Sequence, residues 1–80
     1  MLTGIQVRLA RHALRWSAER LAEQAGVVSK TIRRIEATDD VPNSTAKNLN
    51  QIKTVLESAG IEFIGTPEDR PGIRIGKPRR

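Results

Sequence analysis

Residues 17–37 read SAERLAEQAGVVSKTIRRIEA, and this stretch predicts two short helices joined at Gly26. In its first half, three apolar side chains fall on one helical stripe: Leu21, Ala22 and Ala25. Ser17 precedes them and can cap the open backbone donors of the first turn. Glycine readily adopts the left-handed conformation common at helix ends, so Gly26 ends this helix. We expect a second helix over residues 28–37.

This second helix has one apolar and one cationic face. At about 100° per residue, Ile32 and Ile35 lie close together and mark the buried side. The outward side carries a hydroxyl and three cations: Ser29, Lys30, Arg33 and Arg34. Such a face suits the major groove of DNA, where Lys and Arg also reach guanine edges. The alternative is a solvated basic face, because exposed helix faces are usually charged; the turn at Gly26 and the paired helix favour DNA binding.

The chain resembles the phage Cro and repressor family of helix-turn-helix proteins, often called XRE-type regulators. The resemblance covers residues 5–59. The matching residues are Trp16-Ser17, Leu21-Ala22, Ala25-Gly26-Val27, Thr31-Ile32 and Ile35-Glu36. It implies a mainly α, four-helix domain at residues 1–60 that binds double-stranded DNA through the helix at residues 28–37.

The resemblance also implies roles for individual residues. Those expected at base edges are Ser29, Lys30 and Arg34. Those expected near the DNA backbone are Ser17, Ala18 and Thr31, and we place Arg33, the remaining cation of the outward face, with them. Arg11 and Glu36 are expected to form a structural ion pair. Val28 stands where the family usually has a capping Ser or Thr; Ser29 is the alternative cap, and in that role it would not contact bases.

Two further helices are expected around this unit. Residues 5–15 place Val7, Ala10 and Leu14 on one stripe. After the second helix of the unit, Pro42 interrupts the chain, and Asn43 or Ser44 can cap a helix that runs from Ser44 to Ala59 and stops at Gly60.

The C-terminal residues change in character. Two β-branched runs, IEFIG and GIRIG, are separated by TPEDRP, which predicts a β-hairpin or an exchanged strand arm over residues 61–76. Each strand has an apolar pair on one face, and we expect these four residues to form a dimer interface: Ile61, Phe63, Ile73 and Ile75. Whether the strands pair within one chain or between two is left open. Residues 77–80 are expected to form a basic tail.

Composition agrees with a small binding module. The 80 residues carry a formal net charge of +5, which favours an anionic partner. Residues 1–36 hold seven Lys or Arg against three Asp or Glu, whereas residues 37–66 hold two against four. The basic surface is therefore concentrated around the helix pair and, with five cations against two acids in residues 67–80, in the C-terminal segment.

Other classes of protein fit the composition poorly. The chain has no cysteine, and His12 is its only histidine, so neither a thiolate metal site nor a nucleophile–base pair can be assembled. We expect no enzyme activity, no cofactor and no bound metal. No apolar run resembles a signal peptide or a membrane span, so a cytoplasmic protein without membrane contact is expected.

We therefore expect a homodimeric, sequence-specific transcriptional regulator, a repressor or autoregulator, that binds a palindromic operator. No separate effector domain is expected within these 80 residues. The alternative is an antitoxin or other protein-interaction module that binds a protein partner through the C-terminal arm.

Overall fold

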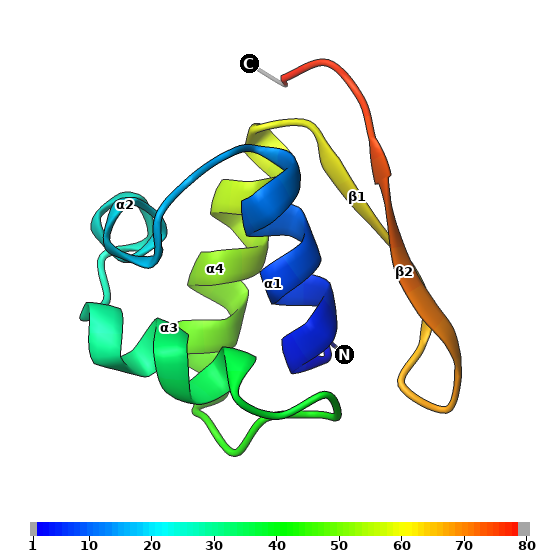
Figure 1. Cartoon of the computed structure of the whole chain (residues 1–80), viewed down its shortest axis with the longest axis horizontal. Helices are drawn as coiled ribbons and strands as arrows, with labels where there is room; N and C mark the ends of the chain where they lie inside the picture. The colour runs from blue at the N-terminus through cyan, green and yellow to red at the C-terminus, as the bar shows by residue number, and fades with distance from the viewer. Residues whose placement is uncertain (1, 79–80) are drawn as a thin grey trace.

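The structure is a computed structural model that describes residues 2–78, in which four helices precede one antiparallel hairpin (Figure 1). The elements are α1 (Gly4–Ala13), α2 (Ala18–Ala25), α3 (Ser29–Glu36), α4 (Ala46–Ser58), β1 (Ile61–Thr66) and β2 (Asp69–Ile75). The expectation of a mainly helical chain with a C-terminal hairpin is confirmed. Arg79 and Arg80 of the expected basic tail lie outside the described residues. Within residues 2–78, every helix is too short or too polar to span a bilayer.

Side-chain caps explain where three of the helices begin. Thr3 and Gln6 form a reciprocal capping box at the start of α1, in which each side chain accepts a hydrogen bond from the other's backbone N–H. Ser17 accepts from the Arg20 N–H at the start of α2, as the sequence predicts. At α4 the cap is Thr45, which accepts from Asn48 N–H at 3.1 Å, so the expectation of Asn43 or Ser44 was wrong by one or two positions.

The turn between α2 and α3 is set by Gly26. This glycine has φ 71° and ψ 31°, the left-handed conformation that L-residues with side chains adopt only at a cost. Gly26 and Val27 donate hydrogen bonds back to carbonyls of the last turn of α2, and the Val27 side chain packs against the core. The chain therefore reverses sharply, and α3 begins only three residues after Gly26.

All these elements except β2 contribute buried side chains to one hydrophobic core. Its buried members are Leu2, Val7, Ala10, Leu21, Ala22, Ala25, Ile32, Ile35, Ile52, Leu56 and Ile61. In Figure 1, α4 lies behind α1, and α1 also contacts α3 directly. Because Ile61 of β1 is 1% exposed within this core, the segment after residue 60 shares the core of the helices and does not form a separate unit.

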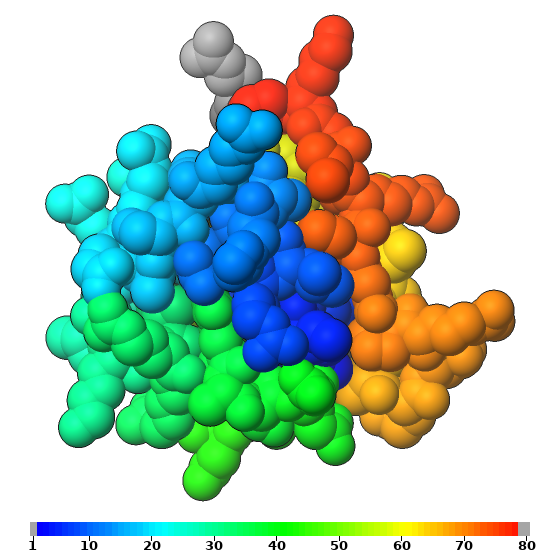
Figure 2. All heavy atoms as spheres, viewed as in Figure 1, coloured from blue at the N-terminus to red at the C-terminus, as the bar shows by residue number. Residues whose placement is uncertain are grey.

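The hairpin pairs within the chain, which answers the question that the sequence leaves open. Ile61 faces Ile75 and Phe63 faces Ile73, and the register shifts between Ile64 and Thr66. The hairpin lies alongside α1, on the side away from α2 and α3 (Figures 1 and 2). A two-stranded hairpin is barely stable by itself in water, so this support is needed.

Gln6 joins the hairpin to α1. While its side-chain oxygen serves the capping box, its Nε2 donates to the carbonyl oxygens of Ile64 at 3.0 Å and Gly72 at 2.9 Å, one on each strand. The side chain is 2% exposed and all of these bonds are buried or partly buried. One amide thus satisfies backbone groups of the helix start and of both strands.

The residues expected at a dimer interface are mostly used within the chain. Ile61 is buried, while Phe63 and Ile73 are half-buried and pack against the same core. Ile75 differs, because 69% of it is exposed. Among these four residues, Ile75 therefore offers the most surface to a second chain.

Gly4 allows α1 to approach the end of α3. A Cβ at this position would overlap the carbonyl oxygens of Ile35 and Thr38, and the Gly4 N–H donates to the Asp40 carbonyl oxygen at 2.9 Å. We expect Gly4→Ala to lower the free energy of unfolding by about 1–3 kcal/mol, because backbone must move to admit the methyl group. Urea unfolding measures this change.

Gly72→Ala is the matched control. Its Cβ would make ordinary contacts of 3.6 and 3.8 Å with the Ile64 side chain, so little destabilisation is expected. Equal unfolding free energies for the two variants would contradict the close approach at Gly4.

Candidate nucleic-acid interface

The two faces of α3 differ sharply in burial. Ile32 and Ile35 are at most 1% exposed, and Thr31 and Glu36 are each 8% exposed. On the other side, Lys30, Arg33 and Arg34 are exposed and Ser29 is half-buried. The separation that the sequence predicts is therefore present, and α3 presents its cationic face to solvent.

Glu36, at the end of α3, is held by Arg11 of α1. Arg11 Nε lies 2.8 Å from Glu36 Oε2, and Nη2 lies 2.8 Å from Oε1, so the guanidinium and carboxylate form a two-pronged ion pair. Arg11 Nη1 also donates to the Trp16 carbonyl oxygen at 2.9 Å. The Arg11 side chain is 16% exposed and that of Glu36 is 9% exposed. The Arg11 side chain therefore links α1 to the α1–α2 turn and to α3.

The electrostatics of this pair keep Arg11 charged. The hydrogen bond to Glu36 raises the pKa of Arg11 above its already high ordinary value, and the charge of the carboxylate adds to the effect against the opposing influence of burial. A second arginine, Arg8, donates to the Glu36 carbonyl oxygen at 2.8 Å and pairs with Asp39 at 3.1 Å. Both cations of α1 are thus used to fix the end of α3.

The outward face of α3 also contains an ion pair. Arg33 pairs with Glu19 of α2, and its Nη1 donates to Ser29 Oγ at 3.1 Å. Ser29 is the first residue of α3, and Val28 occupies the capping position with no side-chain hydrogen bond. The alternative in which Ser29 caps the helix was therefore wrong; its hydroxyl accepts from Arg33 instead.

Lys30 and Arg34 are the two cations of this face for which the described residues provide no ion-pair partner. Arg34 borders a hollow with polar residues between α3 and the start of α4: Asn43, Ser44, Thr45 and Asn48. Within the described part of the chain, Ser44 Oγ has no hydrogen-bond partner. From the sequence, Asn43 and Ser44 were expected only as caps, and Thr45 and Asn48 only as parts of the following helix; their signal was the run of amide and hydroxyl side chains around the start of α4. They extend the polar surface beyond α3.

The residues expected near the DNA backbone differ in accessibility. Ser17 is exposed and caps α2, and Ala18 is half-buried beside it. Arg20, in the same turn, lies with its guanidinium 5.3 Å from the centre of the Trp16 ring, a cation–π distance. Thr31, by contrast, is only 8% exposed, so it offers little surface to a phosphate.

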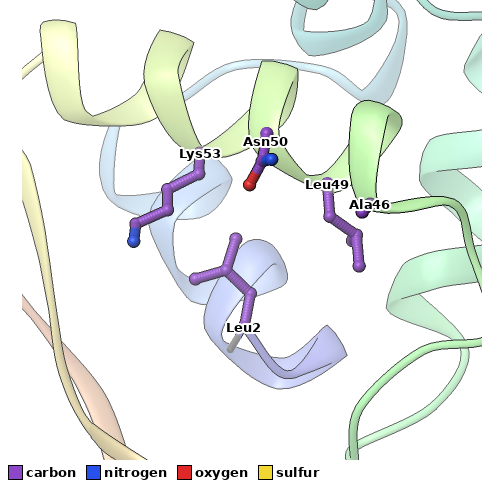
Figure 3. A pocket seen from close by; sticks show the side chains of 5 residues that line it. All are labelled: Leu2, Ala46, Leu49, Asn50 and Lys53. Carbon is purple, nitrogen blue, oxygen red and sulfur yellow. The ribbon is translucent and has the colours of Figure 1, made fainter.

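The surface has a further hollow, lined by a different set of residues. Figure 3 shows a hollow between the start of α1 and α4, with Leu2 pointing towards the side chains of Leu49, Asn50 and Lys53. The residues that line it include no carboxylate, imidazole or hydroxyl, and its volume of about 260 Å³ is below the usual range of small-molecule sites. Among the described residues, no three His, Asp or Glu side chains are grouped in a way that could hold a metal ion.

No protein-family model matches this chain, and a comparison with curated proteins finds no relative.

The Arg11–Glu36 pair leads to a stability prediction. Arg11→Ala and Glu36→Ala should each lower the free energy of unfolding by about 3–5 kcal/mol, because each leaves a largely buried charge without its partner. This is a large share of the roughly 5–15 kcal/mol that stabilises a small domain. Thermal and urea unfolding would measure the loss.

The double variant Arg11→Met/Glu36→Leu is the control, because it removes both charges while keeping apolar volume. Its free energy of unfolding should be closer to that of the parent protein than that of either single variant. Single variants that unfold at the same midpoint as the parent would show that the pair contributes nothing to stability.

Proposed function

We propose that this protein is a sequence-specific double-stranded DNA-binding regulator in which α3 enters the major groove. The observation that carries the proposal is the division of α3 into a buried apolar face and an exposed face that bears Lys30, Arg33 and Arg34. A helix fits the width of the major groove, and Lys or Arg there can contact both phosphates and guanine edges.

The arrangement of α2 and α3 supports the same proposal. The two helices are in contact and are joined through the left-handed Gly26, and α3 is held against α1 by Arg11. This matches what the Cro and repressor resemblance implies, and we propose that the four helices form a helix-turn-helix domain of that type. In such domains the second helix of the pair reads bases while the first crosses the backbone.

Contacts of two kinds would follow from this docking. Lys30, Arg34 and Ser29 lie on the outward face and are proposed to contact base edges. Phosphates would be met at the exposed start of α2, at Ser17 and Ala18, and at the polar surface between α3 and α4, at Asn43 and Asn48. Phosphate contacts set the position of the protein, whereas base contacts select the sequence.

A dimer would let this small reader recognise a longer site. Half-sites one DNA turn apart are separated by about 34 Å. Two copies related by a two-fold axis would reach successive major grooves on one side of the duplex by presenting their α3 helices at that spacing. A homodimer on a palindromic operator, acting as a repressor or autoregulator, is the form of regulation we propose.

A role in protein interaction is the second candidate. It is favoured by Ile75, a large apolar residue that is 69% exposed at the end of β2, on a hairpin turned away from α3. An antitoxin or similar module could bind a protein partner there while α3 remains free. Tight, salt-dependent DNA binding by the purified chain alone would support the regulator instead.

Selection of bound duplexes from a random DNA library tests the regulator directly. We expect an enriched palindrome whose half-sites are centred about one helical turn apart, because a two-fold dimer would present α3 twice. Enrichment of a single half-site would support DNA reading and contradict the proposed dimer. No enrichment over random sequence would contradict the proposed function.

Substitution on α3 tests which residues read bases. Lys30→Ala and Arg34→Ala should each weaken binding to the selected site by about 1–3 kcal/mol and relax the preference at one base position. Affinity for the selected site and for its single-base variants, measured at fixed salt, gives both quantities.

Lys53→Ala is the matched control, since it removes one exposed positive charge from α4. It should leave base preference unchanged. If Lys30→Ala and Arg34→Ala behave like Lys53→Ala, α3 is not the reading helix.

A further inference from the structure

The cationic face of α3 is bordered by one carboxylate that belongs to α2. Glu19 and Arg33 form an ion pair across the two helices, with side chains 61% and 59% exposed. Glu19 lies in the first turn of α2, directly after Ser17 and Ala18. If α3 enters the major groove, this acidic side chain lies at the edge of the protein–DNA contact, where phosphates would repel it.

The pair extends to a third residue. Arg33 Nη1 donates to Ser29 Oγ at 3.1 Å, and Nη2 donates to the Glu19 carboxylate. Both terminal nitrogens of the planar guanidinium therefore have a partner that fixes its orientation. A hydroxyl has one hydrogen and two lone pairs. Arg33 occupies one lone pair of Ser29, so the hydroxyl keeps its hydrogen and a single lone pair for another group, and its capacity to accept is reduced while its capacity to donate is not.

We propose that Glu19 is a specificity-determining positioning residue that holds Arg33 against Ser29. In this arrangement the Arg33 charge is neutralised beside the groove, and Ser29 presents a hydrogen-bond donor to an acceptor on a base edge. The inference rests on the proposed DNA-reading role of α3. It changes the role of Arg33 from a phosphate contact to a residue that orients Ser29.

The Glu19–Arg33 pair should therefore lower the affinity of the protein for DNA of any sequence. It should also sharpen the preference for the selected sequence over others. Phosphate contacts by free cations bind all sequences alike. A donor directed into the major groove meets acceptors on guanine, on adenine N7 and on thymine O4, whereas cytosine presents a donor there. Since Arg33 already uses one of the two lone pairs of Ser29, donation to such an acceptor is favoured over acceptance from cytosine, and Ser29 should disfavour cytosine at the position it faces.

An exposed ion pair is weak by itself, so the effect must come from the neighbouring DNA. If Arg33 leaves Glu19 to reach a phosphate, the unpaired carboxylate stays at the same edge of the contact. The attraction between Arg33 and the phosphate is then opposed by repulsion between Glu19 and the phosphates. Removal of Glu19 ends this opposition and releases Arg33.

The test compares Glu19→Ala with Glu23→Ala. Both variants remove one exposed negative charge from α2, but among the described residues only Glu19 pairs with Arg33. Binding to a duplex that lacks the selected site is measured between 50 and 200 mM salt. Relative to Glu23→Ala, Glu19→Ala should steepen the slope of log affinity against log salt concentration by about 0.9. The affinity of Glu19→Ala for this duplex should then fall roughly three- to four-fold more than that of Glu23→Ala as the salt is raised across that range.

A second measurement follows base preference. Glu19→Ala should lower the ratio of affinities for the selected site over its cytosine variant at the Ser29 position, and Ser29→Ala should lower it as well. Glu23→Ala should leave the ratio as in the parent protein. Unchanged ratios in both Glu19→Ala and Ser29→Ala would overturn the role assigned to Ser29.

A double variant shows whether Glu19 acts through Arg33. In an Arg33→Ala background, Glu19→Ala should steepen the salt dependence less than it does in the parent protein, because no Arg33 is left to be released. A change as large as that in the parent protein would mean that Glu19 acts only by repelling DNA directly, which would overturn the inference.

The outcomes separate this inference from the proposed function. A parent protein that selects no DNA sequence contradicts the regulator itself. A parent protein that selects a site, with Glu19→Ala indistinguishable from Glu23→Ala in salt dependence and base preference, contradicts only the role of Glu19.

Discussion

The ion pair between Arg11 and Glu36 is the contact on which the placement of α3 depends. The helix has eight residues and its capping position carries Val28, which makes no side-chain cap. So short a helix is marginal in water without tertiary support. Arg11 supplies that support at the C-terminal end, since it binds both carboxylate oxygens of Glu36 and the carbonyl of Trp16. The orientation of the exposed face therefore depends on a buried contact beneath it.

The start of α1 also joins parts of the chain that are far apart in the sequence. Gly4 lets the helix meet the backbone at the end of α3, and Gln6 connects the capping box of α1 to both strands of the hairpin. An 80-residue chain buries a limited core, and a two-stranded hairpin is barely stable alone. Sharing Ile61 with the helical core gives the hairpin its support and enlarges that core.

The outward surface of α3 combines free and restrained cations. Lys30 and Arg34 have no ion-pair partner among the described residues, whereas Arg33 is directed by Glu19 and Ser29. In a protein that reads DNA, free and restrained cations would affect affinity and sequence preference differently. A free cation is attracted to the phosphates of every duplex and, as proposed for Lys30 and Arg34, can also contact a guanine edge, whereas a restrained Arg33 adds to the preference for one sequence only through Ser29. The balance between them would set how selectively the proposed regulator binds.

Much of the local structure followed from the sequence alone. The apolar stripe before Gly26, the left-handed turn, the two faces of α3 and the alternation in the hairpin depend on neighbouring residues, and periodicity and capping rules describe such dependence well. The ion pair of Arg11 with Glu36 was implied by the family resemblance. The choice of Thr45 over Ser44 as a cap was missed because helix boundaries depend on how the preceding loop packs.

Tertiary structure decided the contacts between residues far apart in the chain. Gln6 reaches Ile64 and Gly72, 58 and 66 residues away, and Ile61 enters the helical core and so is not left free for a second chain. Glu19 meets Arg33 only because α2 and α3 cross at the angle that Gly26 and the core impose. Periodicity shows which face of an element is apolar, but the partner of each side chain is set by how the elements pack together in three dimensions.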